Sequence, residues 1–197
     1  SLVAQSGGLC GQCWGDTHFI SGLVCDKCGA PLPGDEGGED EYCDDCLTIA
    51  RPWNKGRAAL IYKGAGRNLI LGLKHGDRTE VGKSAGKWLE RAATGLLHHN
   101  VIVAPVPLHW TRFFKRRYNQ SALLAESLTA LTGARFVPDL LVRRKKTGSL
   151  DGLTKEKRFE TLQGAISVNP RNQHDIAGKE VLVVADVMTS GATFAAC

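Results

Sequence analysis

The segment that most constrains the fold is Val181–Thr193, which reads VLVVADVMTSGAT. Its first four residues are apolar and mostly β-branched, which is typical of a strand buried on both faces. A carboxylate, Asp186, and a run of small residues follow, and we expect that run to open a helix. Backbone N–H groups, small hydroxyls and a helix N-terminus suit a phosphate, and the carboxylate suits ribose hydroxyls. The segment therefore predicts a sugar-phosphate site; the alternative is an ordinary strand followed by an N-capped helix.

The rest of the chain after residue 50 alternates between strand and helix patterns. Apolar runs predict further strands at 58–62, 101–106 and 166–168. Apolar residues at helical spacing predict helices at 68–73, 81–97 and 119–131, the last ended by Gly133. The basic stretch 143–158 contains two glycines and is typical of a mobile loop. This alternation predicts a doubly wound, mainly parallel α/β sheet, which binds ligands at the carboxyl ends of its strands.

Two of the predicted strands end in candidate ligand turns, at 105–107 and 186–193, and a dense basic patch lies between them along the chain. The patch contains Arg112, Lys115, Arg116 and Arg117. Arginines beside a strand-end turn can clamp a pyrophosphate. They can equally follow a nucleic-acid backbone while neighbouring aromatic rings stack on bases. The third interpretation is a solvated basic face, and the sequence leaves all three open.

Six of the seven cysteines form Cys-x-x-Cys pairs, at residues 10/13, 25/28 and 43/46. Two such pairs suit one tetrahedral Zn²⁺ held by four thiolates, and Gly29 permits a tight turn after the second pair. Few apolar residues lie between the pairs, so this segment needs a metal to fold. A redox motif would occur singly beside a βαβ unit, so we interpret the pairs as a structural zinc site. The set Cys25, Cys28, Cys43 and Cys46 is the closer match to a ribbon, and Cys10, Cys13, Cys25 and Cys28 is the alternative.

The distribution of charge divides the chain into two modules. Residues 1–50 carry nine acidic side chains against one lysine, a net charge of −8. The other 147 residues carry eleven acidic and 24 basic side chains, a net charge of +13. We therefore expect a zinc-ribbon module at 1–50, here called the ribbon, and a ligand-binding domain at 51–197, here called the body. The basic body is the module suited to phosphates.

The chain contains no apolar run of 18 residues and no charged-then-apolar signal segment at its start. We therefore expect no membrane insertion and a cytoplasmic location, where paired cysteines favour metal over disulfides. The first residue is Ser, and the last lies about one turn into the helix after the 186–193 turn. We interpret the chain as a fragment truncated at both ends, and a short natural C-terminus is the alternative.

Taken together, the motifs resemble the ComF family, in which an N-terminal zinc ribbon precedes a type I phosphoribosyltransferase domain. The resemblance rests on CGQCW, CDKCG and CDDC in the ribbon. In the body it rests on LKHGDR at 73–78, VPLHWTRFFKRRYNQ at 106–120 and the 181–193 segment, in the family's order. An earlier cysteine knuckle of the family's ribbon is missing. The resemblance implies a phosphoribosyltransferase fold, structural zinc, and phosphoribosyl pyrophosphate (PRPP) bound with Mg²⁺.

The resemblance also implies roles for individual residues. Asp186 would hold the ribose and act as the catalytic carboxylate, and the 5′-phosphate would be cradled by Thr189, Ser190, Gly191, Ala192 and Thr193. The pyrophosphate loop would consist of Ala104, Pro105, Val106 and Pro107. Residues 145–160, here called the hood, would close over the substrate. The chain departs from the family's pattern at Ala185, where an acidic residue is usual, at Leu150, where Gln is usual, and at Thr161, where Asn is usual.

Two functions follow from these expectations. In the first, the protein is an enzyme that binds Mg–PRPP and transfers its phosphoribosyl group to a nitrogen acceptor by electrostatic positioning, without a covalent nucleophile. In the second, catalysis is weak, and the basic face binds single-stranded DNA or a protein of the competence machinery, since family members are linked to DNA uptake. The intact TSGAT run favours the first function, whereas Ala185 and the basic body favour the second.

Overall fold

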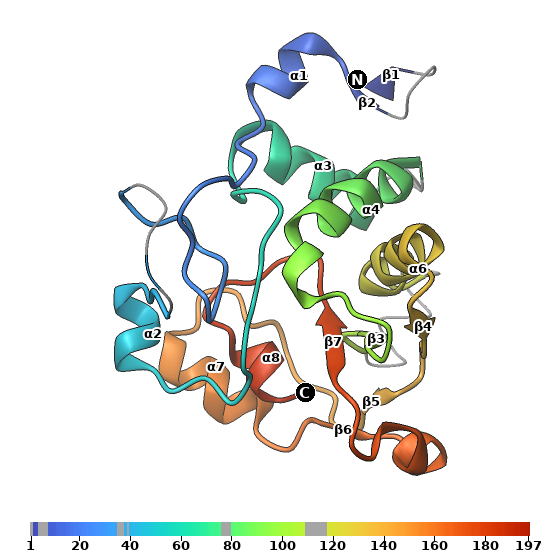
Figure 1. Cartoon of the computed structure of the whole chain (residues 1–197). Coiled ribbons are helices and arrows are strands. Elements are labelled where there is room, and N and C mark those ends of the chain that lie inside the picture. Colours follow the sequence, from blue (N-terminus) through green and yellow to red (C-terminus); the bar gives the residue numbers. More distant parts are fainter. Residues whose placement is uncertain (1, 4–7, 35–37, 39, 76–79, 109–117) are drawn as a thin grey trace.

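The computed structural model of the chain describes residues 2–3, 8–34, 38, 40–75, 80–108 and 118–197 (Figure 1). The ribbon contains β1 (Leu2–Val3), β2 (Gly8–Leu9), α1 (Gly11–Gly15) and α2 (Asp44–Thr48). The strands of the body are β3 (Ile102–Pro105), β4 (Arg135–Phe136), β5 (Leu141–Arg143), β6 (Ile166–Val168) and β7 (Val181–Val184). Its helices are α3 (Gly64–His75), α4 (Glu80–Ala92), α6 (Gln120–Thr132), α7 (Lys155–Leu162) and α8 (Ala192–Ala195), with 3-10 turns η1 (Thr94–Leu96) and η2 (Pro170–Ile176).

The central sheet of the body is parallel and has the strand order β4-β3-β7. Strand β3 is buried along its whole length, and its four residues pair in register with β7, from Ile102 opposite Val181 to Pro105 opposite Val184. Strand β7 lies at the edge of this sheet, so Val181 is 37% exposed and only Val184 is buried. The prediction that 181–184 is buried on both faces was therefore wrong, although the strand itself is confirmed.

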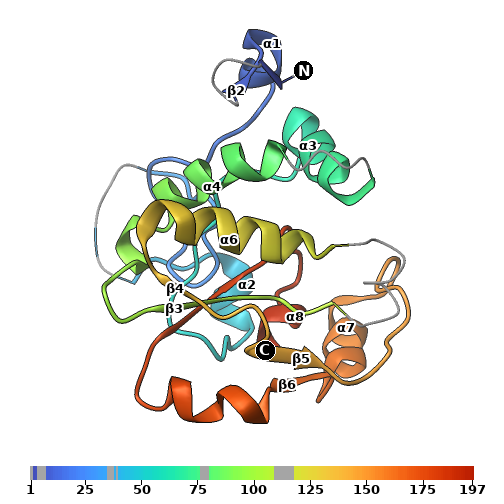
Figure 2. The same cartoon turned by 90° about the vertical axis from the view of Figure 1, so that its right-hand side faces the viewer.

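One face of the sheet is covered by α3, α4 and α6, of which α4 and α6 run side by side above the strands (Figures 1 and 2). The predicted helix at 119–131 is α6, which begins after Asn119 and ends at Gly133, whose φ of 70° is the left-handed C-cap conformation. At the N-terminus of α6, the Asn119 side chain accepts a hydrogen bond from the Ser121 N–H. The core between sheet and helices is formed by Ile70, Leu73, Val81, Val103, Leu124 and Leu128.

The other face of the sheet is covered by an antiparallel pair, β5 and β6, together with η2 and the end of the chain (Figure 2). Its core contains Ile102, Ala104, Leu140, Leu141 and Ile166, with Ala196 and Cys197 packed against them. The predicted strand at 166–168 exists, but it pairs with β5 and does not join the parallel sheet. The fold class, an α/β protein with a mainly parallel sheet, is confirmed.

Two local predictions were wrong. The run 58–62 is not a strand, because it connects the ribbon to α3 and pairs only through an isolated bridge between Leu60 and Phe19 of the ribbon. The stretch 143–158 is not a loop throughout, because α7 begins at Lys155. The Thr154 hydroxyl caps this helix by accepting from the Lys157 N–H at 3.4 Å, and such a cap stabilises an exposed helix of charged residues. Among the described residues, no helix is both long enough and apolar enough to cross a bilayer.

Candidate functional site

Four cysteines of the ribbon converge on one point. The Sγ atoms of Cys25, Cys28, Cys43 and Cys46 all lie within 4.8 Å of one another. The sulfurs of Cys28 and Cys43 are 3.6 Å apart. Four Zn–S bonds of about 2.3 Å at tetrahedral angles place neighbouring sulfurs about 3.8 Å apart. The geometry of the four thiols therefore suits one structural zinc ion.

The backbone around each pair explains why the sulfurs converge. After the Cys25/Cys28 pair, the N–H of Gly29 donates to the carbonyl of Cys25 at 2.7 Å, and Gly29 has a φ of 73°. A Cβ at Gly29 would lie 2.4 Å from the backbone nitrogen of Ala58, so only glycine fits this turn. In the Cys43/Cys46 pair, Cys43 is the N-cap of α2, and the N–H of Cys46 donates to the carbonyl of Cys43 at 2.8 Å. Both knuckles therefore turn their two sulfurs to the same side.

The electrostatics of the cluster also call for a cation. Burial raises the pKa of the Cys28 thiol. Burial also opposes ionisation of Cys25, but hydrogen bonds from the backbone of Cys43, Cys28 and Lys27 outweigh it and lower the pKa of that thiol to about 7. Neighbouring thiolates repel one another, so four of them are stable in one place only around a positive charge. A divalent ion that binds thiolates supplies that charge, and Zn²⁺ is the common choice.

The alternative set of zinc ligands is not brought together. Cys10 is the N-cap of α1 and Cys13 lies within it, and within the described ranges neither belongs to the four-sulfur group. The placement of the thiols therefore favours Cys25, Cys28, Cys43 and Cys46 over the set that includes Cys10 and Cys13.

The two candidate ligand turns of the body meet at one edge of the sheet, as expected for adjacent parallel strands. Beyond the paired residues Pro105 and Val184, the N–H of Val106 donates to the carbonyl of Val184 at 2.8 Å. The Asn119 side-chain amide donates to the carbonyl of Val106 at 3.0 Å, which fixes this loop against the start of α6. Residues 104–107 are buried, and none of them has a charged side chain. They therefore offer only backbone groups to this edge.

The 186–193 turn is held by hydrogen bonds between residues one or two positions apart in the chain. Asp186 accepts from the N–H of Val187 at 2.9 Å, and the hydroxyl of Ser190 accepts from the N–H of Ala192 at 3.4 Å. Gly191 has a φ of 82°, in the left-handed region. Ser190, Gly191 and Ala192 are buried, whereas Thr189 is exposed. The turn thus presents Thr189 to the outside and holds its remaining small residues against the rest of the protein.

The hood lies directly on the 186–193 turn. The guanidinium of Arg158 donates to the hydroxyl of Thr189 at 2.8 Å and to the carbonyl of Leu153 at 3.1 Å. The turn, Arg158 and Leu150 enclose a cavity of about 30 Å³. That volume holds roughly two water molecules, far less than a sugar phosphate.

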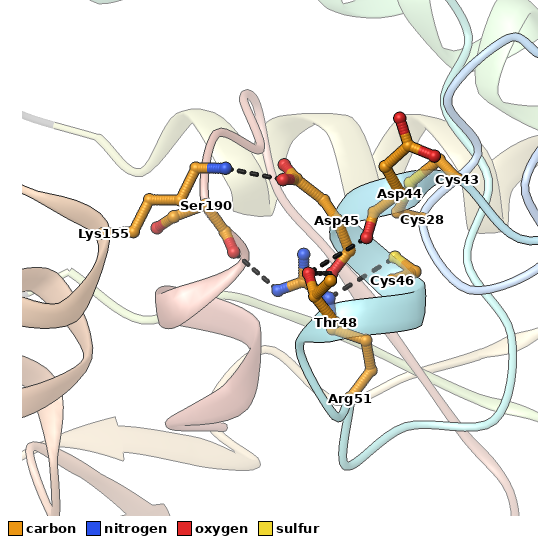
Figure 3. A network of polar contacts seen from close by, with 9 residues as sticks. All are labelled: Cys28, Cys43, Asp44, Asp45, Cys46, Thr48, Arg51, Lys155 and Ser190. Atoms are coloured by element: carbon orange, nitrogen blue, oxygen red, sulfur yellow. Dashed lines mark hydrogen bonds and ion pairs between the residues drawn. The ribbon is translucent and has the colours of Figure 1, made fainter.

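Sequence reasoning missed two basic residues that connect the ribbon to this edge. Arg51 donates to the carbonyl of Ser190 at 2.6 Å, and Lys155 of the hood pairs with Asp45 of α2 at 2.6 Å (Figure 3). The hydrogen bond and charge of Lys155 lower the pKa of the Asp45 carboxyl. No motif marks either residue, because each acts on a partner more than 100 positions away. The one signal that the sequence offers is that Arg51 lies five positions after Cys46, the last cysteine of the ribbon.

The basic residues predicted to bind nucleic acid, Arg112, Lys115, Arg116 and Arg117, lie outside the described residues. The described chain resumes at Tyr118, whose hydroxyl donates to the carbonyl of Leu73 at 2.6 Å. This bond ties Tyr118 to α3.

Comparison with known proteins identifies relatives along nearly the whole chain. A family model for the double zinc ribbon domain matches residues 1–47. The chain is 28% identical over 199 residues to the DNA utilization protein YhgH of Escherichia coli K12, which covers 95% of this chain and 81% of that protein. It is 26% identical over 198 residues to competence protein F of Haemophilus influenzae. This alignment covers 93% of this chain and 86% of that protein.

No solved structure matches the chain significantly. The assignment rests on the two relatives, on the ribbon match and on the convergent cysteines. The chain is thus a homologue of the YhgH and competence F proteins, and its residues 1–47 match a double zinc ribbon domain, in agreement with the resemblance of its motifs to the ComF family.

Proposed function

We propose that the body, residues 51–197, binds Mg–PRPP at the carboxyl edge of β3 and β7 and serves the transfer of phosphoribosyl to a nitrogen acceptor. The observation that carries the proposal is the in-register parallel pairing of β3 with β7. This pairing brings residues 104–107 and the 186–193 turn to one edge, although they are about 80 positions apart in the chain. Ligands of open α/β sheets bind at such an edge.

Three groups of residues at this edge would each bind a different part of PRPP. Asp186 would hold the ribose hydroxyls, because it is the first carboxylate after β7 and Ala185 stands where the resembled family has another acidic residue. The N–H groups and hydroxyls of Thr189, Ser190, Gly191, Ala192 and Thr193 would surround the 5′-phosphate. The backbone of Ala104, Pro105, Val106 and Pro107 would face the pyrophosphate.

The Mg²⁺ that accompanies PRPP fits a site with so few carboxylates. Magnesium keeps several waters and is commonly held by substrate phosphates plus one or two carboxylates, and Asp186 supplies one. When bound, the ion neutralises charge on the pyrophosphate leaving group. The chain's own residues position the C1′ atom, at which the bond to pyrophosphate breaks and the bond to nitrogen forms. Arg158, which now donates to Thr189, adds a positive charge beside the phosphate position.

Calorimetric titration of the protein with PRPP tests the proposal. With Mg²⁺ present we expect saturable binding of one PRPP per chain, and without Mg²⁺ we expect markedly weaker binding. Ribose 5-phosphate is the control that occupies the 5′-phosphate and ribose positions only, and it should bind more weakly than PRPP. Absence of any PRPP binding at millimolar concentration, in protein with its zinc retained, would contradict the proposal.

A second function is favoured by two observations, the net charge of +13 on the body and the names of the relatives, a DNA utilization protein and a competence protein. In this alternative, the basic patch of Arg112, Lys115, Arg116 and Arg117 binds single-stranded DNA or a protein of the competence machinery, and transfer of phosphoribosyl from PRPP is weak. Phosphate contacts release counterions, so DNA affinity through this patch would fall steeply with salt.

We expect the double variant Arg116→Ala with Arg117→Ala to bind a single-stranded oligonucleotide less tightly than the wild type and with a flatter salt dependence. Each lost phosphate contact lowers the slope of log affinity against log salt by about 0.7 for a single strand. Fluorescence anisotropy at several salt concentrations measures this slope. Arg171→Ala with Lys179→Ala removes the same charge elsewhere on the body and should leave the slope near the wild-type value. Salt-independent binding, or none at low salt, would remove this alternative.

A further inference from the structure

We propose that Arg51 is a positioning residue that couples the metal state of the ribbon to the conformation of the 186–193 turn. With zinc on the four cysteines, Arg51 holds the turn in the shape described here. When the metal is lost, the turn is released. The consequence for PRPP affinity rests on the proposed function, whereas the coupling itself does not.

The first link is a single guanidinium that joins the cysteine cluster to the turn. Its Nε–H donates to the Sγ of Cys46 at 3.5 Å, and its Nη1–H donates to the carbonyl of Ser190 at 2.6 Å (Figure 3). An arginine is always charged and presents donors in a fixed plane, so its two contacts move together. A shift of Cys46 is therefore transmitted to Ser190 through one rigid group.

The second link passes through Trp53 and reaches the other knuckle. The indole N–H of Trp53 donates to the carbonyl of Lys27, between Cys25 and Cys28 in the chain, at 2.5 Å. The guanidinium of Arg51 lies 5.5 Å from the centre of the Trp53 ring. Trp53 also approaches the ring of Phe194 in α8, with centroids 6.0 Å apart. Both knuckles are thus connected to the turn and to the helix that follows it.

The turn is shaped around these two side chains. A Cβ added at Gly191 would lie 2.6 Å from Nη1 of Arg51 and 3.0 Å from the Trp53 ring. Gly191 therefore serves two purposes, the left-handed φ of 82° and the close approach of Arg51. The contact is packed as tightly as glycine allows, so a displaced Arg51 leaves the turn without its support.

Metal loss acts on Arg51 through the backbone. The ribbon between the knuckles needs the metal to stay folded, so removing the metal frees the chain that leads from Cys46 to Arg51. The ion pair between Lys155 and Asp45 is half-exposed at both ends and contributes little by itself, so we assign the coupling to Arg51.

Hydrogen exchange of residues 189–194, measured without any ligand, tests the coupling. In the wild type, we expect chelation of zinc to speed exchange of this segment about tenfold or more, because a hydrogen bond to a charged group is lost. In Arg51→Ala with zinc bound, the segment should already exchange fast, and chelation should add little. This non-additivity distinguishes coupling from two independent destabilising effects.

Two further variants complete the experiment. Arg57→Ala is the matched control, since its guanidinium pairs with Asp26 of the ribbon at 2.7 Å and its side-chain hydrogen bonds within the described part of the chain go to Asp26 and Gly56, not to the turn. It should retain the zinc dependence of the wild type. Arg51→Lys keeps the charge, but one ammonium cannot reproduce both donors of the planar group, so it should lose most of the zinc dependence. Zinc content and circular dichroism establish that each variant is folded.

Two results would overturn the inference. One is wild-type protection of residues 189–194 in zinc-loaded Arg51→Ala. The other is a chelation effect in Arg51→Ala as large as in the wild type. Because no PRPP is present, failure of PRPP to bind leaves this result intact and counts against the proposed function alone.

Discussion

Zinc is expected to co-purify with the protein at about one ion per chain, and its removal is expected to unfold the ribbon while the sheet of the body survives. Among the described ribbon residues, the buried apolar side chains are Leu9 and the thiols of Cys25 and Cys28. This is too little apolar surface to stabilise a fold without a metal. In contrast, the body keeps its own core between the sheet and α3, α4 and α6.

Metal analysis and hydrogen exchange measure this effect. Replacement of Cys28 or Cys43 by Ser should remove the zinc and the exchange protection of residues 23–34 and 40–46, because each cysteine supplies one of four ligands. Cys197→Ala is the matched control. Burial raises the pKa of this thiol to about 12, and it lies in the body, away from the four sulfurs. A zinc-free protein with a protected ribbon would show that the cluster does not depend on metal.

Asp186→Asn is expected to weaken PRPP binding by about tenfold or more. One carboxylate is available for the ribose hydroxyls because Ala185 occupies the neighbouring acidic position. Charge-assisted hydrogen bonds of this kind contribute about 1.5–3 kcal/mol each. The substitution is nearly isosteric, and the Asn oxygen can still accept from the N–H of Val187, so the local turn should persist. The loss of affinity then reports the charge and not a collapsed loop.

Calorimetry with Mg–PRPP compares this variant with two others. Asp175→Asn removes an equal charge from an exposed pair with Arg135, away from the turn, and should bind like the wild type. Ala185→Asp restores the second carboxylate and should tighten binding or raise the rate of transfer, provided that its charge finds a partner. Equal PRPP affinity of the wild type and Asp186→Asn would mean that the turn is retained for structure alone, and the enzyme proposal would fall with it.

Patterns that act over a few neighbouring residues were sufficient to predict several elements from the sequence. The apolar runs at 101–106 and 181–184 became β3 and β7, and the helix at 119–131 ends at Gly133 as predicted. The mainly parallel sheet was also predicted, from the alternation of strand and helix patterns, whereas the direct pairing of β3 with β7 was seen only in the structure. The roles of Asp186 and of residues 189–193 toward PRPP remain predictions.

Contacts between distant segments were decided only by the tertiary structure. Cys-x-x-Cys spacing allows either set of four cysteines, and the fold brings together the later one. The run 166–168 has the composition of any buried strand, and its antiparallel partner β5 is known only from the fold. In the sequence, residues 155–158 resemble part of a basic loop. In the structure, Thr154 caps them as the start of a helix that packs on α8.

The ribbon itself was evident from the spacing of its cysteines, since two residues between ligands suffice to place both sulfurs on one ion. Its connection to the body was not. Arg51 and Ser190 are 139 positions apart, and nothing in the composition of either segment indicates that they meet. Local geometry is encoded by neighbours in the chain, so the sequence determined the knuckles, the strands β3 and β7, and the end of α6 at Gly133. The position of Arg51 between Cys46 and the 186–193 turn depends on how two modules pack, and only the tertiary structure decided it.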